Sequence, residues 1–417
     1  MRSKAMTKIN QSLLALAIAA STSSVALAES VAITNVQLHT ASAQGVLEDA
    51  TVVFVDGKIS AINPAAVSAE TIIDGKGKVL TPGFISTMNT VGLVEVGQEK
   101  DSRDTGDERA GMTFDPSLAY NPKSTTIAFA RKGGLTTSVV SADGGEDIFV
   151  GQTFVAKMSG DWDSVISTHG ALFVTLGAEH DGSRAVGMQT LSTKLEETQK
   201  ALSSANKGEA EEDTELDKEA VIFNAVLASE KALVVQVDRA SDIMQLLKLK
   251  KQYGIDLVLV GAADAVSVAE HIAKADVPVL IDAMRNLPES FDSLHNSLDN
   301  AAKLTQAGVK VVLTTGGAHS VYGLRYAAGN AVANGMDYQA ALKSVTINAA
   351  QVFDIEAGEV AVGKRADLVL WSGDPFEYST QVEAMWIGGE AQSMQSRLDK
   401  LRDRYLTQSD MPRAYSK

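Results

Sequence analysis

The sequence predicts an α/β protein in which a barrel of parallel strands lies between two β-rich ends. From Pro82 onward, short apolar runs alternate with helical stretches over about 270 residues, a pattern typical of strands joined by crossover helices. Residues 31–80 and the stretch from Gly358 onward read instead as β strands and turns. At this length a closed barrel is favoured over an open doubly wound sheet, because no Gly-x-Gly-x-x-Gly motif follows the first strand.

The first β segment contains two Asp-Gly pairs. Residues 50–55 are apolar, Asp56-Gly57 follows, and residues 58–62 form a second partly apolar run. An Asp-Gly pair between two such runs is a strong hairpin signal, since both residues tolerate a positive φ. Asp74-Gly75 repeats the pattern and predicts a second turn of the same kind.

The barrel strands are expected at short apolar runs that follow one another along the chain. These runs are residues 84–85, 136–140, 171–176, 233–237, 257–260, 277–281 and 309–313. Between two of them, residues 240–253 place apolar side chains at helical spacing, and Gly254 follows. This pattern predicts a helix that ends at a glycine cap.

The last part of the chain returns to β structure. Residues 366–371 and 382–387 flank the turn residues Gly373-Asp374-Pro375. Because neither terminal β segment can bury enough apolar surface alone, we expect strands from both ends to share one sheet. The tail from residue 392 is expected to be helical and is rich in Arg and Lys.

The first 28 residues have the order of a secretory signal peptide. A basic start precedes the apolar run 13–20, and Ala26-Leu27-Ala28 forms a small-x-small cleavage site. Cleavage after Ala28 and a periplasmic location are therefore expected. No later segment has ~18 unbroken apolar residues, so membrane insertion is not expected.

Net charge and cysteine content limit the kinds of partner and of site that the chain is expected to have. Without the signal peptide, which carries three basic residues and no acid, the net charge is about −18. Such a surface repels phosphate backbones, so nucleic acid is not an expected partner. The chain has no cysteine, which excludes disulfides, thiolate metal sites and a lipid-anchor cysteine from this sequence.

Several segments resemble one family. Residues 48–62 (EDATVVFVDGKISAI) and 73–85 (IDGKGKVLTPGFI) resemble the opening of amidohydrolase-superfamily proteins, and residues 358–375 (GEVAVGKRADLVLWSGDP) resemble the closing segment. Residues 234–260 and 307–313 are similar to the fifth, sixth and eighth barrel strands of the imidazolonepropionase-like branch.

The resemblance implies a (β/α)8 TIM-type barrel with a composite β-sandwich formed from both termini. The expected division is a signal peptide at 1–28, a sandwich from 29–81 plus 356–392, a barrel over 82–355, and a C-terminal helical tail over 393–417.

The resemblance also implies a metal-dependent hydrolase, yet the metal ligands are replaced. Family members hold zinc or another divalent metal with His and carboxylate side chains at strand ends. Where the family has Asp-x-His-x-His after Pro-Gly-Phe-Ile, Met88 and Thr90 occupy the two His positions. The other ligand positions fall on Gln236 (fifth strand), Val260 or Gly261 (sixth strand) and Gly316 (eighth strand). The sequence therefore predicts no metal and no cofactor at this site.

Three further residues are candidates for a rebuilt site. Glu179 is the nearest candidate for the fourth-strand position, and Asp238 and His319 also follow expected strands. Since the C-terminal ends of barrel strands form the mouth, all three are expected there. A His beside carboxylates could act as a general acid or base.

Two functions remain open. In the first, the chain is an exported amidohydrolase-like protein that is catalytically impaired or non-catalytic. It would then bind a small molecule, form a homo-oligomer, or pair with an active amidohydrolase paralogue. In the alternative, the chain hydrolyses non-peptide C–N bonds, in cyclic or linear amides, through an altered site. The loss of the family's metal ligands favours the first.

Overall fold

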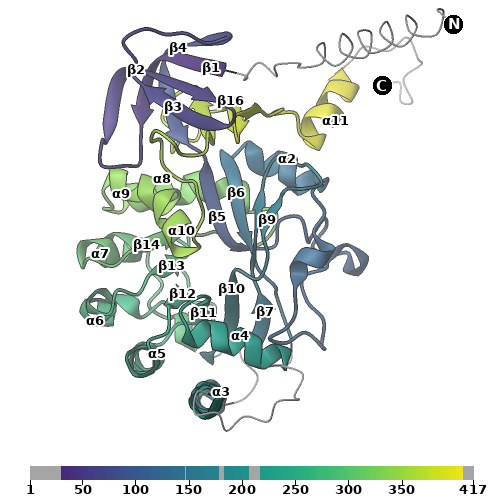
Figure 1. Cartoon of the computed structure of the whole chain (residues 1–417), viewed down its shortest axis with the longest axis vertical. Coiled ribbons are helices and arrows are strands. Elements are labelled where there is room, and N and C mark those ends of the chain that lie inside the picture. The colour runs from purple at the N-terminus through teal and green to yellow at the C-terminus, as the bar shows by residue number, and fades with distance from the viewer. Residues whose placement is uncertain (1–29, 146, 178–182, 206–216, 407–417) are drawn as a thin grey trace, which may run out of the picture.

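The computed structural model describes residues 30–145, 147–177, 183–205 and 217–406. The signal-peptide segment and Glu179 lie outside these ranges. The expected fold class is confirmed: a β sheet built from both ends of the chain packs against a barrel whose helices lie outside its strands (Figure 1). Within the described residues, no helix has the length and apolar character needed to cross a membrane.

The terminal sheet has seven strands in the order β17-β16-β15-β4-β1-β2-β3. Their bounds are β1 (Ser30–His39), β2 (Val46–Val55), β3 (Lys58–Ile62), β4 (Thr71–Pro82), β15 (Leu368–Trp371), β16 (Val382–Ile387) and β17 (Glu390–Ala391). Strand β4 pairs antiparallel with β15, with Leu80 opposite Leu370. The expectation that strands from both ends share one sheet is therefore confirmed.

The first Asp-Gly pair forms the predicted hairpin. It connects the antiparallel strands β2 and β3, and Asp56 and Gly57 have φ values of +48° and +77°. Two positive φ values in a row are what a tight primed turn requires. The turn lies so close to the β16–β17 turn that a Cβ added at Gly57 would be 2.6 Å from the Gly388 carbonyl oxygen.

The second Asp-Gly pair does not form a turn between two strands, which corrects the expectation. Strand β4 continues through it and runs parallel to β1 on both sides. Thr34 pairs with Asp74 and Val36 with Lys78. Strand β4 therefore has more residues than β1 between these two pairs, and the register shifts there. The Asp74 carboxylate accepts a hydrogen bond from the Lys76 N–H at 2.9 Å, which stabilises this local bend.

The barrel strands form two hydrogen-bonded arcs, β14-β13-β12-β11-β10-β7 and β5-β6-β8-β9. Their bounds are β5 (Phe84–Asn89), β6 (Leu135–Val140), β7 (Phe149–Gln152), β8 (Phe154–Lys157), β9 (Val165–Ser167), β10 (Ala171–Thr175), β11 (Ala232–Val237), β12 (Leu257–Gly261), β13 (Val279–Ile281) and β14 (Val311–Leu313). Strands β10 to β14 are parallel throughout.

One barrel strand runs opposite to the others, contrary to the expected parallel order. Strands β7 and β8, separated only by Thr153, are antiparallel to β10 and β6 respectively. Residues 141–148 connect β6 to β7, and so short a connection cannot contain the crossover helix that a parallel pair needs. One hydrogen bond links the two arcs: the hydroxyl of Thr314, which directly follows β14, donates to the carbonyl oxygen of Thr87 in β5 at 2.6 Å.

Helices cover the outside of the barrel. The α-helices are α2 (Thr125–Arg131), α3 (Arg184–Ala205), α4 (Lys218–Leu227), α5 (Ala240–Tyr253), α6 (Ala269–Lys274), α7 (Asn300–Gln306), α8 (Leu324–Ala333), α9 (Tyr338–Ser344), α10 (Ile347–Val352) and α11 (Arg397–Leu406). The 3-10 helices are η1 (Lys100–Ser102), η2 (Pro116–Ala119), η4 (Ala265–Val268), η5 (Phe291–Ser293) and η6 (Val321–Gly323). Helix α5 ends as predicted: Gly254 has φ +73° and donates its N–H to the Lys250 carbonyl.

Trp371 lies where the terminal sheet meets the barrel. Its backbone belongs to β15, while its fully buried side chain packs in the core of the barrel. The indole N–H donates to the Thr81 hydroxyl at 2.9 Å, and the ring centroid lies 5.3 Å from that of Phe84. One side chain thus joins the two parts of the fold.

Candidate functional site

A pocket of about 290 Å³ opens at the C-terminal ends of the barrel strands. Seven of the residues singled out in the sequence line it: Met88, Thr90, Gln236, Asp238, Val260, Gly261 and Gly316. They lie at the ends of β5, β11 and β12 and in the segment after β14, so the barrel brings together residues more than 220 positions apart. The C-terminal ends of barrel strands are where barrel enzymes place their sites.

His319 does not line this pocket. It lies in a separate pocket beside Glu95 and helix α2, and its Nε2 donates to the Glu95 carbonyl oxygen at 3.0 Å. The segment after β14 therefore brings Gly316 to the barrel mouth and carries His319 away from it.

Apolar side chains form part of the lining of the mouth pocket. Met88, which is 8% exposed, lines it together with Phe173, Val260 and Ile281. Met88 has φ +49°, a backbone conformation that is uncommon for a residue with a long side chain. Local strain of this kind persists only where the surroundings impose it, and it is concentrated at functional sites.

A buried polar network fixes the adjoining strand end. The Asn89 side-chain amide, 1% exposed, donates to the Ser138 hydroxyl at 2.9 Å, and the Ser86 hydroxyl donates to the same atom at 2.9 Å. The Val91 N–H donates to the Asn89 side-chain oxygen at 3.1 Å. The network holds the ends of β5 and β6 together, next to Met88 and Thr90.

Two carboxylates of the pocket share one arrangement. Asp238 directly follows β11 and accepts the Ala263 N–H at 3.1 Å; Asp282 directly follows β13 and accepts the Met284 N–H at 2.8 Å. Burial raises the pKa of Asp238 and also that of Asp282. Sequence reasoning missed Asp282, although it follows an apolar run just as Asp238 does. Carboxyl groups with raised pKa values in a pocket are typical of functional sites.

Changing Asp238 to Asn is expected to stabilise the protein at neutral pH. The folded-state pKa of Asp238 lies above its ordinary value, so ionising the group destabilises the fold once the pH exceeds the ordinary pKa. The gain in free energy of unfolding should thus be present at pH 7 and fade as the pH falls below the ordinary value. Urea unfolding at pH 3 and pH 7 measures it. The exposed Asp276, changed to Asn, is the control; equal effects at both sites would contradict the prediction.

Among the described residues that line the pocket, Arg285 is the cationic one. The Arg285 Nη1 lies 3.2 Å from a Glu289 oxygen, and its Nε lies 3.9 Å from the Asp282 carboxylate. Asp143, Asp238 and Asp282 line the pocket together with this single arginine. The arginine therefore compensates the negative charge of these three aspartates only in part.

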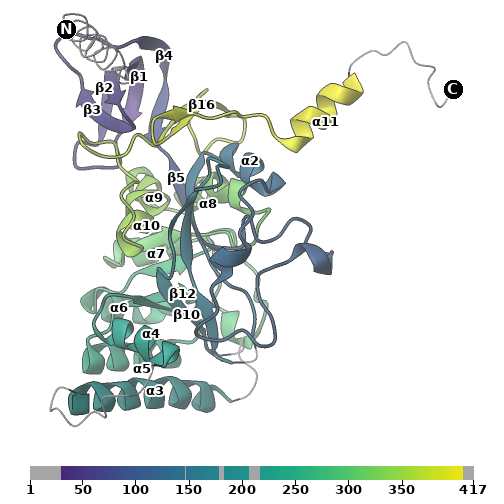
Figure 2. The same cartoon turned by 45° about the vertical axis from the view of Figure 1, so that its right-hand side comes forward.

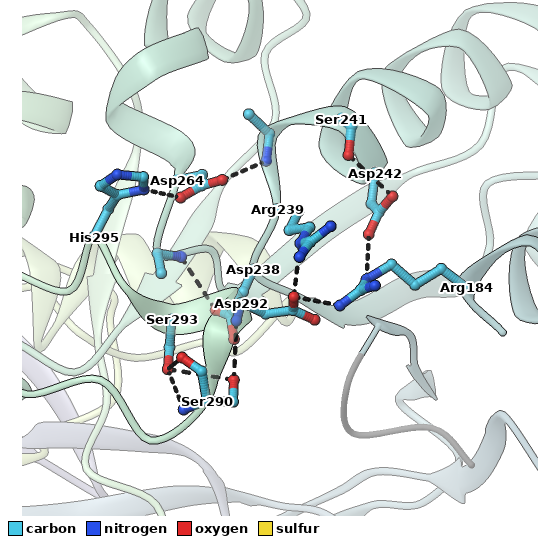
Figure 3. A network of polar contacts seen from close by, with 12 residues as sticks. Arg184, Asp238, Arg239, Ser241, Asp242, Asp264, Ser290, Asp292, Ser293 and His295 are labelled. Carbon is cyan, nitrogen blue, oxygen red and sulfur yellow. Dashed lines mark hydrogen bonds and ion pairs between the residues drawn. The ribbon is translucent and has the colours of Figure 1, made fainter. Parts of the chain in front are cut away.

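An ion-pair network fixes the rim of the mouth (Figure 3). The Asp292 side chain, 3% exposed, accepts hydrogen bonds from Arg184 and, at 2.7 Å, from the Arg239 Nε. The two guanidinium groups hold the pKa of Asp292 below its ordinary value. His295 Nδ1 lies 2.5 Å from Asp264 Oδ1, a second tie between the segment after β13 and the barrel. These contacts fix residues 282–299 beside the pocket.

The comparisons agree with this geometry. The model of the amidohydrolase family matches residues 252–393, about a third of the chain. Over this segment the chain is similar to the amidohydrolase family. An amidohydrolase structure from Thermotoga maritima MSB8 has the same fold, with TM-score 0.78 and 23% identity over 87% of this chain and 99% of that one. The resemblance to the amidohydrolase superfamily that the opening and closing segments predicted is thereby confirmed.

Other similar proteins are more distant. N-isopropylammelide isopropylaminohydrolase from Burkholderia multivorans ATCC 17616 has TM-score 0.54 and 14% identity over 87% of this chain and 97% of that one, which shows a shared fold. Amidohydrolase tasK of Hapsidospora irregularis is 25% identical over 74% of this chain and 37% of its own length. The chain thus spans little more than a third of that relative.

The donor set at the mouth does not fit the metal site of an amidohydrolase. Among the described residues, its lining includes no imidazole, and no group of three or more His, Asp or Glu lies close enough together to hold a metal ion. A catalytic zinc usually has three protein ligands, with His prominent among them. Met88 offers a thioether, Thr90 and Gln236 offer neutral oxygens, and Gly316 offers no side chain.

Proposed function

We propose that this protein is an exported member of the amidohydrolase family that binds a small ligand at the barrel mouth without the metal-dependent hydrolysis of the family. The observation that carries the proposal is the chemistry at four positions of one pocket. Met88, Thr90, Gln236 and Gly316 line it where the resemblance expects three His and one Asp. An altered donor set lowers affinity for zinc and removes the proton shuttle, while the pocket itself is retained.

The pocket suits a compact polar ligand. Its apolar side chains offer contact area, and its three aspartates and its amide and hydroxyl groups offer hydrogen-bond partners that can orient a small molecule. Export is proposed from the signal-like first 28 residues. Pairing with an active paralogue belongs to the same proposal, since a chain that has lost its own reaction can still support that of a relative.

The metal content of the purified protein tests the proposal. After dialysis, elemental analysis should find well under one zinc, manganese or iron per chain. Restoring the ligands in one variant (Met88→His, Thr90→His, Gln236→His and Gly316→Asp) should raise zinc affinity at least tenfold by titration calorimetry. A control with Met88→Leu, Thr90→Asn, Gln236→Asn and Gly316→Asn changes the same positions without adding an imidazole, and its affinity should stay low. Stoichiometric zinc in the unchanged protein would contradict the proposal.

A second function is favoured by one observation, the two carboxyl groups with raised pKa values in the same pocket. A carboxyl group whose pKa is raised can donate a proton as well as accept one, so Asp238 and Asp282 could act as general acid and base in hydrolysis of an amide C–N bond. Amide turnover by metal-free protein, abolished separately by Asp238→Asn and Asp282→Asn, would establish this second function and contradict the first.

A further inference from the structure

The C-terminal helix α11 lies at the edge of the molecule, beside helix α2. None of its residues is buried, and both views show it projecting beyond helix α2 (Figures 1 and 2). It is anchored at its beginning: the Lys132 Nζ of the segment after α2 lies 2.6 Å from Asp399, and the Ser396 hydroxyl donates to Asp399 at 2.7 Å. Isolated helices shorter than about 12 residues are marginal in water, so the far end of α11 needs further contacts.

One face of α11 is apolar. Leu398, Leu401 and Tyr405 follow one another at spacings of three and four residues, which places them on one side of the helix. Leu398 is 60% exposed and Tyr405 is 80% exposed, and the neighbouring Leu406 is 72% exposed. A row of large apolar side chains that faces water marks an interaction surface.

An apolar pocket of about 430 Å³ lies beside the same face. Leu398 and Leu401 form one wall, and Phe129 of α2 and Val96 form part of the other. Val96 is 47% exposed. A projecting aromatic residue and a pocket that can receive one therefore lie on the same surface of the molecule.

We propose that α11 docks against a second copy of this chain, with Tyr405 of each copy in the pocket beside α11 of the other. A surface that carries both the projecting group and its receptor is self-complementary, which is what a two-fold interface requires. The two contacts form together, and each would cover the apolar face of a helix that is exposed among the described residues of its own chain.

Charge favours a second copy over a membrane surface. Helix α11 carries four basic residues and two acidic ones, whereas residues 95–108, which begin at the pocket, carry six acidic residues and two basic ones. In a two-fold pair the basic helix of one copy faces the acidic segment of the other. An anionic lipid surface would attract α11 but repel the body of a chain whose net charge is −15.

Sedimentation velocity of the mature full-length protein from 1 to 100 μM tests the proposal. The unchanged protein should dimerise with a dissociation constant on the order of micromolar, since an interface formed by one short helix and one pocket of each copy is small. Tyr405→Ser and Val96→Glu should each raise that constant at least tenfold with unchanged circular dichroism. Phe291→Ser is the matched control, because Phe291 is 84% exposed and lies in η5, in the segment after β13, and it should leave the constant unchanged.

Mixing the two variants tests the reciprocal arrangement. Equimolar Val96→Glu and Tyr405→Ser chains retain one intact tyrosine and one intact pocket, so the mixture should form more dimer than either variant alone. A protein that stays monomeric at 100 μM, a dimer unaffected by Tyr405→Ser, or no gain on mixing would overturn the proposal. Binding of the unchanged monomer to vesicles of anionic phospholipid would assign α11 to a membrane surface instead.

Discussion

Replacing Trp371 with alanine is expected to lower the free energy of unfolding by about 3–5 kcal/mol, the range for removing a large aromatic side chain from a core. The side chain is fully buried and belongs to the barrel core, although its backbone lies in the terminal sheet. Its loss removes contacts with Phe84 and leaves the buried Thr81 hydroxyl without the indole N–H that it accepts. Both the barrel and the terminal sheet lose support at the same point.

Urea unfolding followed by far-ultraviolet circular dichroism measures this effect without relying on tryptophan fluorescence. Trp162→Ala is the matched control, since Trp162 is 78% exposed and the Lys123 Nζ lies 5.4 Å from the centroid of its ring. Its loss should cost less than about 1 kcal/mol, as for most exposed positions. Similar losses from the two substitutions would mean that Trp371 does not join the two parts of the fold.

Replacing Gly57 with alanine is expected to cost about 3 kcal/mol. An L-residue held at φ +77° is less favourable than glycine by roughly 1–2 kcal/mol. The added Cβ would also lie 2.6 Å from the Gly388 carbonyl oxygen, so one of two backbone turns must move. Overpacking of this kind typically costs a further 1–3 kcal/mol.

Gly45 supplies a matched control that separates the overpacking cost from the backbone cost. It has φ +68°, and a Cβ added there would meet no atom within 4 Å. Gly45→Ala should therefore show the backbone cost alone, and the difference between the two variants measures the close approach of the turns. Equal losses, determined by urea unfolding, would show that the β2–β3 turn moves freely away from Gly388.

Local features of the fold could be predicted from sequence, and features set by distant partners could not. The turn at Asp56-Gly57 and the end of α5 at Gly254 depend on φ angles that the residues themselves favour. The same dipeptide at Asp74-Gly75 lies inside a continuous strand because β1 pairs with β4 on both sides of it. The β7–β8 strand was not predicted because Thr153 divides it into two four-residue pieces, which are too short to show a periodic hydrophobic pattern.

The candidate site divides in a similar way. Gln236 and Asp238 could be placed at the mouth because they end or directly follow a recognisable strand. Asp282 and Arg285 follow an equally recognisable strand. They correspond to no ligand position that the resemblance supplied, so they were not predicted as site residues. The course of the chain after β14 depends on tertiary contacts, among them that of His319 with the Glu95 backbone, and strand position alone does not give it.

The place of β4 in the terminal sheet has a consequence for how the chain is made. Strand β4 pairs on one side with β1, which precedes it closely, and on the other with β15, which follows about 290 residues later. At ribosomal rates of about 5–20 residues per second, β15 emerges roughly 15–60 s after β4. During that interval the nascent chain carries an open strand edge, a template for pairing with other chains. The growing polypeptide therefore depends on chaperones, or on rapid folding of the barrel between, to keep that edge free until its partner arrives.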